Sequence, residues 1–177
     1  MIDYKIFYSH HALSAVHGAE IIDNRRRGRR LEQIRGDMDD QPETQFDFWL
    51  GEWDVTWGED GRATNHVLRI MDDRIIQENF SAPDLKGMSV SSYDPERSLW
   101  CQTWVDNNGT YLDFTGKFED GKMILVRDAI VLGEQCKQRM VWYNIRANQF
   151  DWNWERSDDG GETWRTLWQI RYQRIQK

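Results

Sequence analysis

The chain has 177 residues, a mass of 21.2 kDa and ten tryptophans. That length predicts one domain, alone or with an extension. The net charge of -7 disfavours a general nucleic-acid binder, which needs a positive surface. No stretch approaches the roughly 18 apolar residues of a membrane-spanning helix, so we expect no membrane span.

The first 43 residues differ from the rest, because they contain no tryptophan and include the basic run at residues 25–30. We interpret residues 1–43 as a leader that is partly helical or disordered, and residues 44–177 as the folded domain. The basic run would suit RNA or anionic lipid, but a solvated segment is the favoured interpretation. The N-terminus lacks the basic and apolar regions of a secretory signal, so we expect a cytoplasmic protein.

From Phe46 onward, short runs rich in aromatic and β-branched residues alternate with polar residues. Turn signals separate these runs at the spacing typical of an all-β sandwich or barrel. Asn108-Gly109 and Asp120-Gly121 fit tight hairpin turns. The predicted strands are residues 52–58, 62–71, 74–81, 87–93, 97–106, 110–118, 122–131, 137–146, 149–157 and 163–174.

Short strands joined by hairpins leave no room for crossover helices, so the predicted fold class is all-β. We expect a closed, up-and-down antiparallel barrel of about 8–10 strands, whose interior would hold one small ligand. The segment Phe46–Leu50 should form a helical turn that plugs one end of the barrel. Asp47 would cap that turn, and Trp49 would pack against Trp53.

Three segments resemble a known family. The run Phe46–Val55 is similar to the opening of a bacterial lipocalin-like (calycin-type) family of unknown function. Tyr93–Pro95 with Gln102–Asp106, and Trp154–Ser157 with Asp159–Trp164, match in the same order. The resemblance covers residues 44–174 and implies a closed antiparallel barrel with a central cavity, but no particular reaction.

The stretch Ser157–Trp164 also resembles the Asp box, a hairpin turn of sialidase propellers. Its Asp and Ser side chains would satisfy turn amides, and its glycines would take positive φ. A propeller needs several blades and the chain has one copy of the motif. We therefore predict a structural turn, not a glycosidase site.

One face of several predicted strands is rich in tryptophan. If that face points inward, the barrel has aromatic walls with few polar groups, the usual character of a small-molecule pocket. Alternatively, the indoles fill the barrel and leave no room for a ligand. The candidate ligand-binding residues are Trp53, Trp57, Trp100, Gln102, Trp104, Arg127, Trp152 and Trp154.

Charged residues inside strands supply candidates for acid–base chemistry. Glu78 shares a face with Ile76 and Phe80, and Arg127 shares one with Met123 and Leu125, so both faces are otherwise apolar. Each charge would then point inward, although an outward, solvated position is the plainer alternative. Glu78 and His66 are the candidate catalytic residues.

The sequence offers few residues that could bind a cofactor or a metal ion. Of the four histidines, His10, His11 and His17 lie in the leader, and none follows His66, where a haem-binding barrel of the nitrobindin kind would need one. No zinc-ligand spacing occurs in the sequence, so we predict neither metal nor cofactor. Cys101 and Cys136 are expected as free thiols, with a single disulfide as the alternative.

The favoured function is binding of a small apolar or aromatic ligand in a tryptophan-lined barrel. One alternative is a metal-free enzyme of the cyclase or isomerase type on the same barrel. Another is a protein-interaction module that uses the leader, and a homodimer stays open. Fold alone does not choose among these functions.

Overall fold

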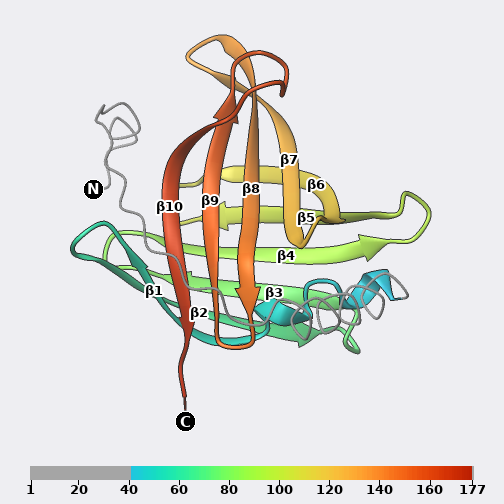
Figure 1. Cartoon of the computed structure of the whole chain (residues 1–177), viewed down its shortest axis with the longest axis vertical. Coiled ribbons are helices and arrows are strands. Elements are labelled where there is room, and N and C mark those ends of the chain that lie inside the picture. Colours follow the sequence, from blue (N-terminus) through green and yellow to red (C-terminus); the bar gives the residue numbers. More distant parts are fainter. Residues whose placement is uncertain (1–40, 177) are drawn as a thin grey trace, which may run out of the picture.

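The computed structural model describes residues 41–176, and the expected leader falls almost wholly outside the described residues. The strands form one closed antiparallel sheet in which each strand pairs with its neighbours in sequence and β10 pairs with β1 (Figure 1). The predicted up-and-down, all-β barrel is therefore confirmed. Its strands are β1 (Gly51–Trp57), β2 (Gly61–Ile70), β3 (Ile75–Ser81), β4 (Lys86–Asp94), β5 (Leu99–Asp106), β6 (Tyr111–Glu119), β7 (Lys122–Val131), β8 (Glu134–Arg146), β9 (Gln149–Ser157) and β10 (Arg165–Arg174).

Local sequence explains where the strands end. Asp120 and Gly121 both have positive φ, 51° and 75°, as a two-residue hairpin turn of the mirror-image type requires. Asn108-Gly109 lies in a longer loop, where Gly109 has a φ of 79°. Within the strands, side chains alternate between the interior and the outer face, as the period of two predicts.

The tryptophan-rich faces point inward. Trp53 and Trp100 are 0% and 1% exposed. The rings of Phe114 on β6 and Trp154 on β9 lie 5.7 Å apart, although two strands separate β6 from β9 in the sheet. These two side chains therefore meet across the interior.

A plug of two 3-10 turns, η2 (Pro42–Thr44) and η3 (Asp47–Trp49), closes one end of the barrel. Phe46, between the turns, is fully buried and contacts the rings of Trp49, Trp100 and Trp142 at 4.9–5.3 Å. Many close aromatic contacts favour burial of this short segment, which has little helical stability of its own.

Two details of the expected plug are wrong. The Asp47 carboxylate does not cap the turn but accepts a hydrogen bond from the Arg69 guanidinium on β2. Trp49 and Trp53 do not stack on each other. The Trp53 indole instead donates to the Trp49 carbonyl at 2.8 Å, and its ring packs on Phe150 and Tyr172.

The barrel has two halves, β1–β6 and β7–β10, whose strands cross in the view of Figure 1. Along the seam between β6 and β7, pairing starts at Glu119 with Lys122 and stops at Thr115 with Val126. Along the seam between β1 and β10, pairing covers residues 53–56 and stops at Thr56 with Arg171. Beyond those pairs, on the side away from the plug, the strands of the two halves are no longer paired along these seams.

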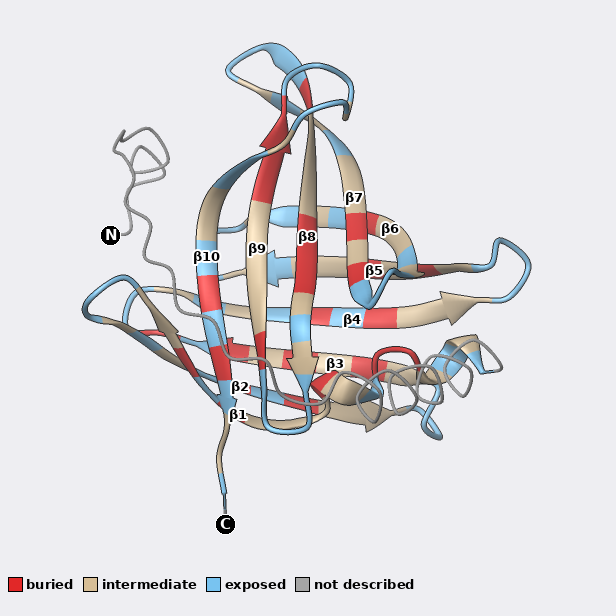
Figure 2. Ribbon diagram, viewed as in Figure 1, coloured by how far each residue is buried: buried red, intermediate tan, exposed pale blue. Residues whose placement is uncertain are grey.

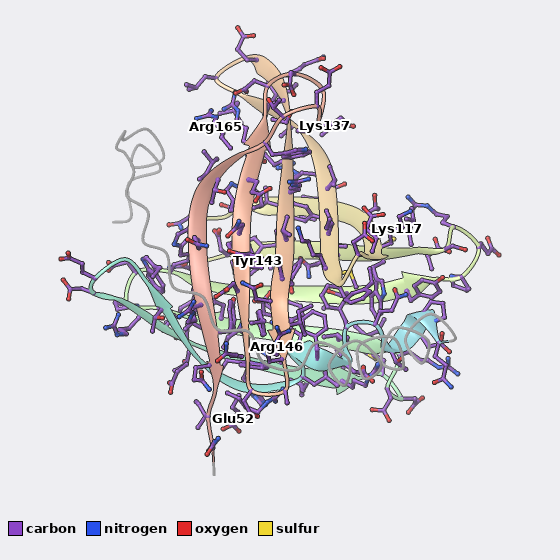
Figure 3. All side chains as sticks on the ribbon, viewed as in Figure 1. Glu52, Lys117, Lys137, Tyr143, Arg146 and Arg165 are labelled. Atoms are coloured by element: carbon purple, nitrogen blue, oxygen red, sulfur yellow. The ribbon has the colours of Figure 1, made fainter. Side chains whose placement is uncertain are left out.

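We call that side the far end. It carries the loops that follow β1, β3, β5, β7 and β9, because strands alternate in direction. Lys137 and Arg165 lie toward the far end of β8 and β10, whereas Arg146 and Glu52 lie near the plug (Figure 3). The two halves thus meet tightly at the plug and diverge toward the far end.

The turn after β9 has the local bonding expected of the Asp box. Asp159 accepts hydrogen bonds from the Ser157 hydroxyl at 2.6 Å and the Thr163 amide at 2.9 Å. Gly160 and Gly161 take φ values of 80° and 105°. The Trp164 ring packs on the Arg139 guanidinium at 4.0 Å, on the outer face of the barrel. This turn is therefore a rigid local structure.

Candidate functional site

The inward side chains form three layers between the plug and the far end. The plug layer is aromatic and almost fully buried. Figure 2 shows in red the buried residues on strands of both halves of the barrel. A polar layer follows near the middle of the barrel. The far-end layer is aromatic again, but its side chains are only half-buried. We take the polar and far-end layers in turn.

Glu78 is the centre of the polar layer. It is 6% exposed, and its two carboxylate oxygens accept hydrogen bonds from the Asn65 amide and the Ser89 hydroxyl, both at 2.7 Å. Burial raises the pKa of Glu78 to about 7, although the bonds from Ser89 and Asn65 partly oppose that rise. The carboxyl group therefore changes protonation near neutral pH.

Tyr172 brings β10 into the same layer. The Asn65 amide nitrogen lies 3.4 Å from the Tyr172 hydroxyl, and Asn65 Oδ1 has no hydrogen-bond partner. Burial and the negative charge of Glu78 raise the Tyr172 pKa far above its usual value, so the phenol stays protonated. Beside this group, Gln102 donates to the Ser91 hydroxyl at 2.9 Å. The side chains of the polar layer thus come from several strands and meet inside the barrel.

The far-end layer holds an indole wall, which we define as Trp57, Trp152, Trp154 and Trp168. Trp168 contacts Trp57 at 5.3 Å and Trp152 at 5.8 Å, both edge to face. Trp152 and Trp154 are nearly parallel at 6.4 Å. All four are half-buried. Phe80 and Trp104, 6.3 Å apart, form a second aromatic group on β3 and β5.

Two glycines hold indoles flat against the barrel wall. A Cβ atom at Gly61 would lie 2.3 Å from the Trp57 ring, and one at Gly87 would lie 2.0 Å from the Trp104 ring. Each ring therefore covers the bare backbone of a neighbouring strand. An alanine at either position would push the indole away from the wall, since so short a separation is sterically forbidden.

The predicted ligand-binding residues separate into groups. Trp53 and Trp100 lie in the plug layer, and Gln102 lies in the polar layer. The far-end layer contains the other four tryptophans, which are half-buried: Trp57, Trp104, Trp152 and Trp154. The plug-layer indoles therefore fill the barrel, as one of the two sequence alternatives has it, whereas the far-end indoles are only half-buried.

Sequence reasoning missed Trp168, which completes the indole wall. A register shift between Thr166 and Trp168 disturbs the alternation at the start of β10. The run Trp168, Ile170 and Tyr172 still has the period of two. This alternation places Trp168 on the same face as Ile170 and Tyr172, and it could have identified Trp168 from the sequence.

Arg127 also points inward, as its apolar strand face predicts. Its Nη1 donates to Gln138 Oε1 at 3.1 Å, and its Cζ lies 5.8 Å from the centre of the Phe114 ring. Its Nε is buried and has no hydrogen-bond acceptor. Within residues 41–176 Arg127 forms no ion pair with a carboxylate.

His66 lies on the outer face of β2 and is exposed. Its neighbour Val67 is the residue that pairs with Glu78 and shares the interior with it. The two candidate catalytic side chains therefore point to opposite faces of the sheet, and the structure does not bring them together.

Across residues 41–176, no group of three His, Cys, Asp or Glu side chains gathers in a way that would hold a metal ion. Cys101 and Cys136 are free, and Cys101 is half-buried rather than buried. The three leader histidines, His10, His11 and His17, lie outside the described residues.

Two surface hollows lie on the outer face of the barrel. One, of about 630 Å³, is lined by side chains of β1, β2 and the start of the β3–β4 loop, including Asp54, Arg62 and Pro83. The other, of about 290 Å³, lies over β4–β6 near Arg97 and Asp113. No tryptophan lines either hollow, although Gln102 and Phe114 are among the residues around the second one.

The chain matches no family model, and no curated protein is significantly similar to it. Between residues 41 and 176 there is no helix with the length and apolar character needed to cross a membrane.

Proposed function

We propose that the protein binds a small apolar or aromatic molecule in the far-end layer of its barrel. The observation that carries this proposal is the half-buried state of the indole wall. Indoles that only filled a core would be expected to be fully buried, as Trp53 and Trp100 are in the plug layer. A planar ligand would cover the remaining ring surface and gain the free energy of removing it from water.

The glycine contacts support the same proposal. Because Trp57 and Trp104 lie flat over Gly61 and Gly87, their rings keep close to opposite parts of the wall. Rings held in this way need little reorganisation on binding, which favours affinity. Phe114 and Trp154, in contrast, meet across the interior, so we place the ligand beside that pair, between Trp57, Trp168 and Trp104.

The test is a titration with N-phenyl-1-naphthylamine, a neutral aromatic probe whose fluorescence rises in apolar surroundings. We expect saturable binding with energy transfer from tryptophan. Trp57→Leu and Trp104→Leu should each weaken binding about tenfold, because each removes a large contact surface. Trp164→Leu is the matched control, since Trp164 packs on the outer face. Absence of saturable binding, or equal losses in all three variants, would refute the proposal.

Acid–base catalysis at Glu78 is a second candidate, favoured by a buried carboxyl with a pKa of about 7. A probe is 5-nitrobenzisoxazole, whose ring opens when a base removes its C–H proton and the N–O bond breaks to give a phenolate. A wild-type protein with an accessible Glu78 should accelerate this opening as pH rises through 7, and Glu78→Gln should abolish the acceleration. Equal rates in both proteins would argue against it.

Two further expectations stay predictions from the sequence, namely membership of the lipocalin-like family and a cytoplasmic location. The sequence leaves a homodimer open. The interaction-module alternative depends on residues 1–43, of which residues 1–40 are outside the described structure.

A further inference from the structure

We infer that the ligand of the far-end layer is an anion, and that Arg127 binds its charged group. This inference rests on the proposed function, because it assigns a charge to the same ligand. The first observation concerns the hydrogen bonds of the Arg127 guanidinium. One donor group, Nη1, bonds to Gln138, whereas Nε is buried and has no acceptor. A buried donor without an acceptor is costly, and an anionic ligand would satisfy it.

The orientation of the guanidinium suits a two-oxygen acceptor. With Nη1 used by Gln138, the edge formed by Nε and Nη2 has no acceptor among residues 41–176. Two N–H groups on one edge match the two oxygens of a carboxylate, or two oxygens of a sulfonate. Lysine offers no such edge, so the geometry favours organic anions of this class.

The surroundings of Arg127 leave its charge uncompensated. Register places Arg127, Gln138 and Arg156 in one inward row across β7, β8 and β9. Arg156 already has a carboxylate partner, since its Nε lies 2.6 Å from Asp158 Oδ1. Arg127 has none within the described residues, and besides Gln138 it contacts the Phe114 ring. An incoming anion would therefore meet an unpaired positive charge.

The position of Arg127 connects that charge with the aromatic layer. Pairing between β6 and β7 stops at Val126, so Arg127 is the first β7 residue beyond the joined part of this seam. Phe114, which packs against Arg127, also contacts Trp154 of the indole wall. A ligand with an aromatic body among the indoles can therefore place an acidic group at Arg127.

Two matched probes test the charge. N-phenyl-1-naphthylamine is neutral, and 8-anilinonaphthalene-1-sulfonate has the same aromatic body with a sulfonate. We expect wild-type protein to bind the sulfonate more tightly. Arg127→Gln should weaken sulfonate binding by about tenfold to a hundredfold, as expected for loss of a charge-assisted hydrogen bond, and leave neutral binding unchanged. Arg127→Lys should recover only part of the loss, because it restores charge without the two-donor edge.

Arg62→Gln is the charge-matched control, since Arg62 lies exposed on the outer face of β2 and binds only backbone carbonyls in the described structure. It should change neither titration. If wild type binds both probes equally and Arg127→Gln alters neither, the inference fails while the proposed function stands. A parallel loss of both probes in Arg127→Gln would also overturn it, by showing a structural role. If neither probe binds wild type, the proposed function itself fails.

Discussion

Glu78 and Arg127 are two inward charges of opposite sign in very different surroundings. The Glu78 carboxylate has a donor on each oxygen and lies in the buried polar layer. Arg127 has one donor group satisfied and another without an acceptor, at a place where two strands part. A fully bonded charge favours a structural or proton-exchanging role, whereas an incompletely bonded one favours recognition of a ligand.

The raised pKa of Glu78 makes stability depend on pH. In the folded protein the group binds its proton up to about pH 7, against 4.5 ordinarily, so the folded state holds more protons over that interval. Stability should therefore fall as pH rises, by about 3 kcal/mol between pH 5 and pH 8. Glu78→Gln should flatten this dependence, because a glutamine can accept from Asn65 and donate to Ser89 without a charge.

Urea unfolding at pH 5, 6.5 and 8 measures the effect. Glu96→Gln, at an exposed loop position, is the control and should keep the wild-type slope. The assigned protonation would be wrong if Glu78→Gln and wild type lost the same stability across this range.

Single residues could be assigned to a face from the sequence, but their partners could not. The alternation of β3 and β7 made Glu78 and Arg127 candidates for the interior, with an outward position as the plainer alternative, and the structure places both inward. Nothing local predicted that Asn65 would approach Tyr172, since 107 residues separate them in the chain. Such contacts depend on how the barrel closes and how its strands twist, which residue spacing does not encode.

At the scale of elements, the turn after β9 illustrates what a short motif can determine. Hydrogen bonds from Ser157 and Thr163 hold the pKa of Asp159 well below its usual range, so the turn should keep its carboxylate ionised even in mild acid. The sequence predicted this turn well, because its bonds join residues at most four apart. The plug was predicted less well, since Asp47 found a partner on β2.

Asp159→Ala should loosen the turn after β9. It removes the acceptor of the Thr163 amide and of the Ser157 hydroxyl. We expect amide exchange in residues 157–164 to become about tenfold faster, with the strands unaffected, because local opening requires no unfolding of the barrel. Hydrogen exchange read by mass spectrometry measures this. Asp60→Ala, in the exposed β1–β2 loop, should leave the segment unchanged, and unchanged exchange in Asp159→Ala would contradict the assignment.

At the scale of the whole molecule, Arg174 helps to close the barrel. From the end of β10 it donates to the carbonyls of Leu50 at 2.6 Å, Phe48 at 3.2 Å and Ala147 at 2.9 Å, and it covers the Trp53 ring at 4.1 Å. It thereby joins the last strand to the plug and to the loop between β8 and β9. Burial lowers the Arg174 pKa, which indicates a partly desolvated charge.

Arg174→Met should destabilise the protein by about 2–4 kcal/mol, because it leaves backbone carbonyls without donors near the buried plug. Arg171→Met is the matched control on the same strand. The Arg171 side chain is 67% exposed, so its ion pair with Asp151 should contribute only about 1 kcal/mol. Chemical unfolding followed by tryptophan fluorescence compares the two. Equal losses would show that Arg174 has no special role in closure.

The number of strands and their order followed from the period of two and the turn residues, so the global fold was predictable. The division into two diverging halves was not, because the end of pairing along a seam depends on accumulated strand twist. The half-buried indoles lie toward the end at which the two halves diverge.

The parted seams have a further consequence, for solution behaviour. Beyond Val126 on β7 and before Arg171 on β10, one side of each strand lacks the neighbour that barrel closure would supply. These stretches are strand edges, and an unpaired edge can template growth of a sheet with another chain. Along the β7 edge, the exposed Ile130 favours such growth, while Asp128, paired with Lys137, supplies charge that disfavours it. We therefore expect charged residues along these edges to hinder pairing between separate chains.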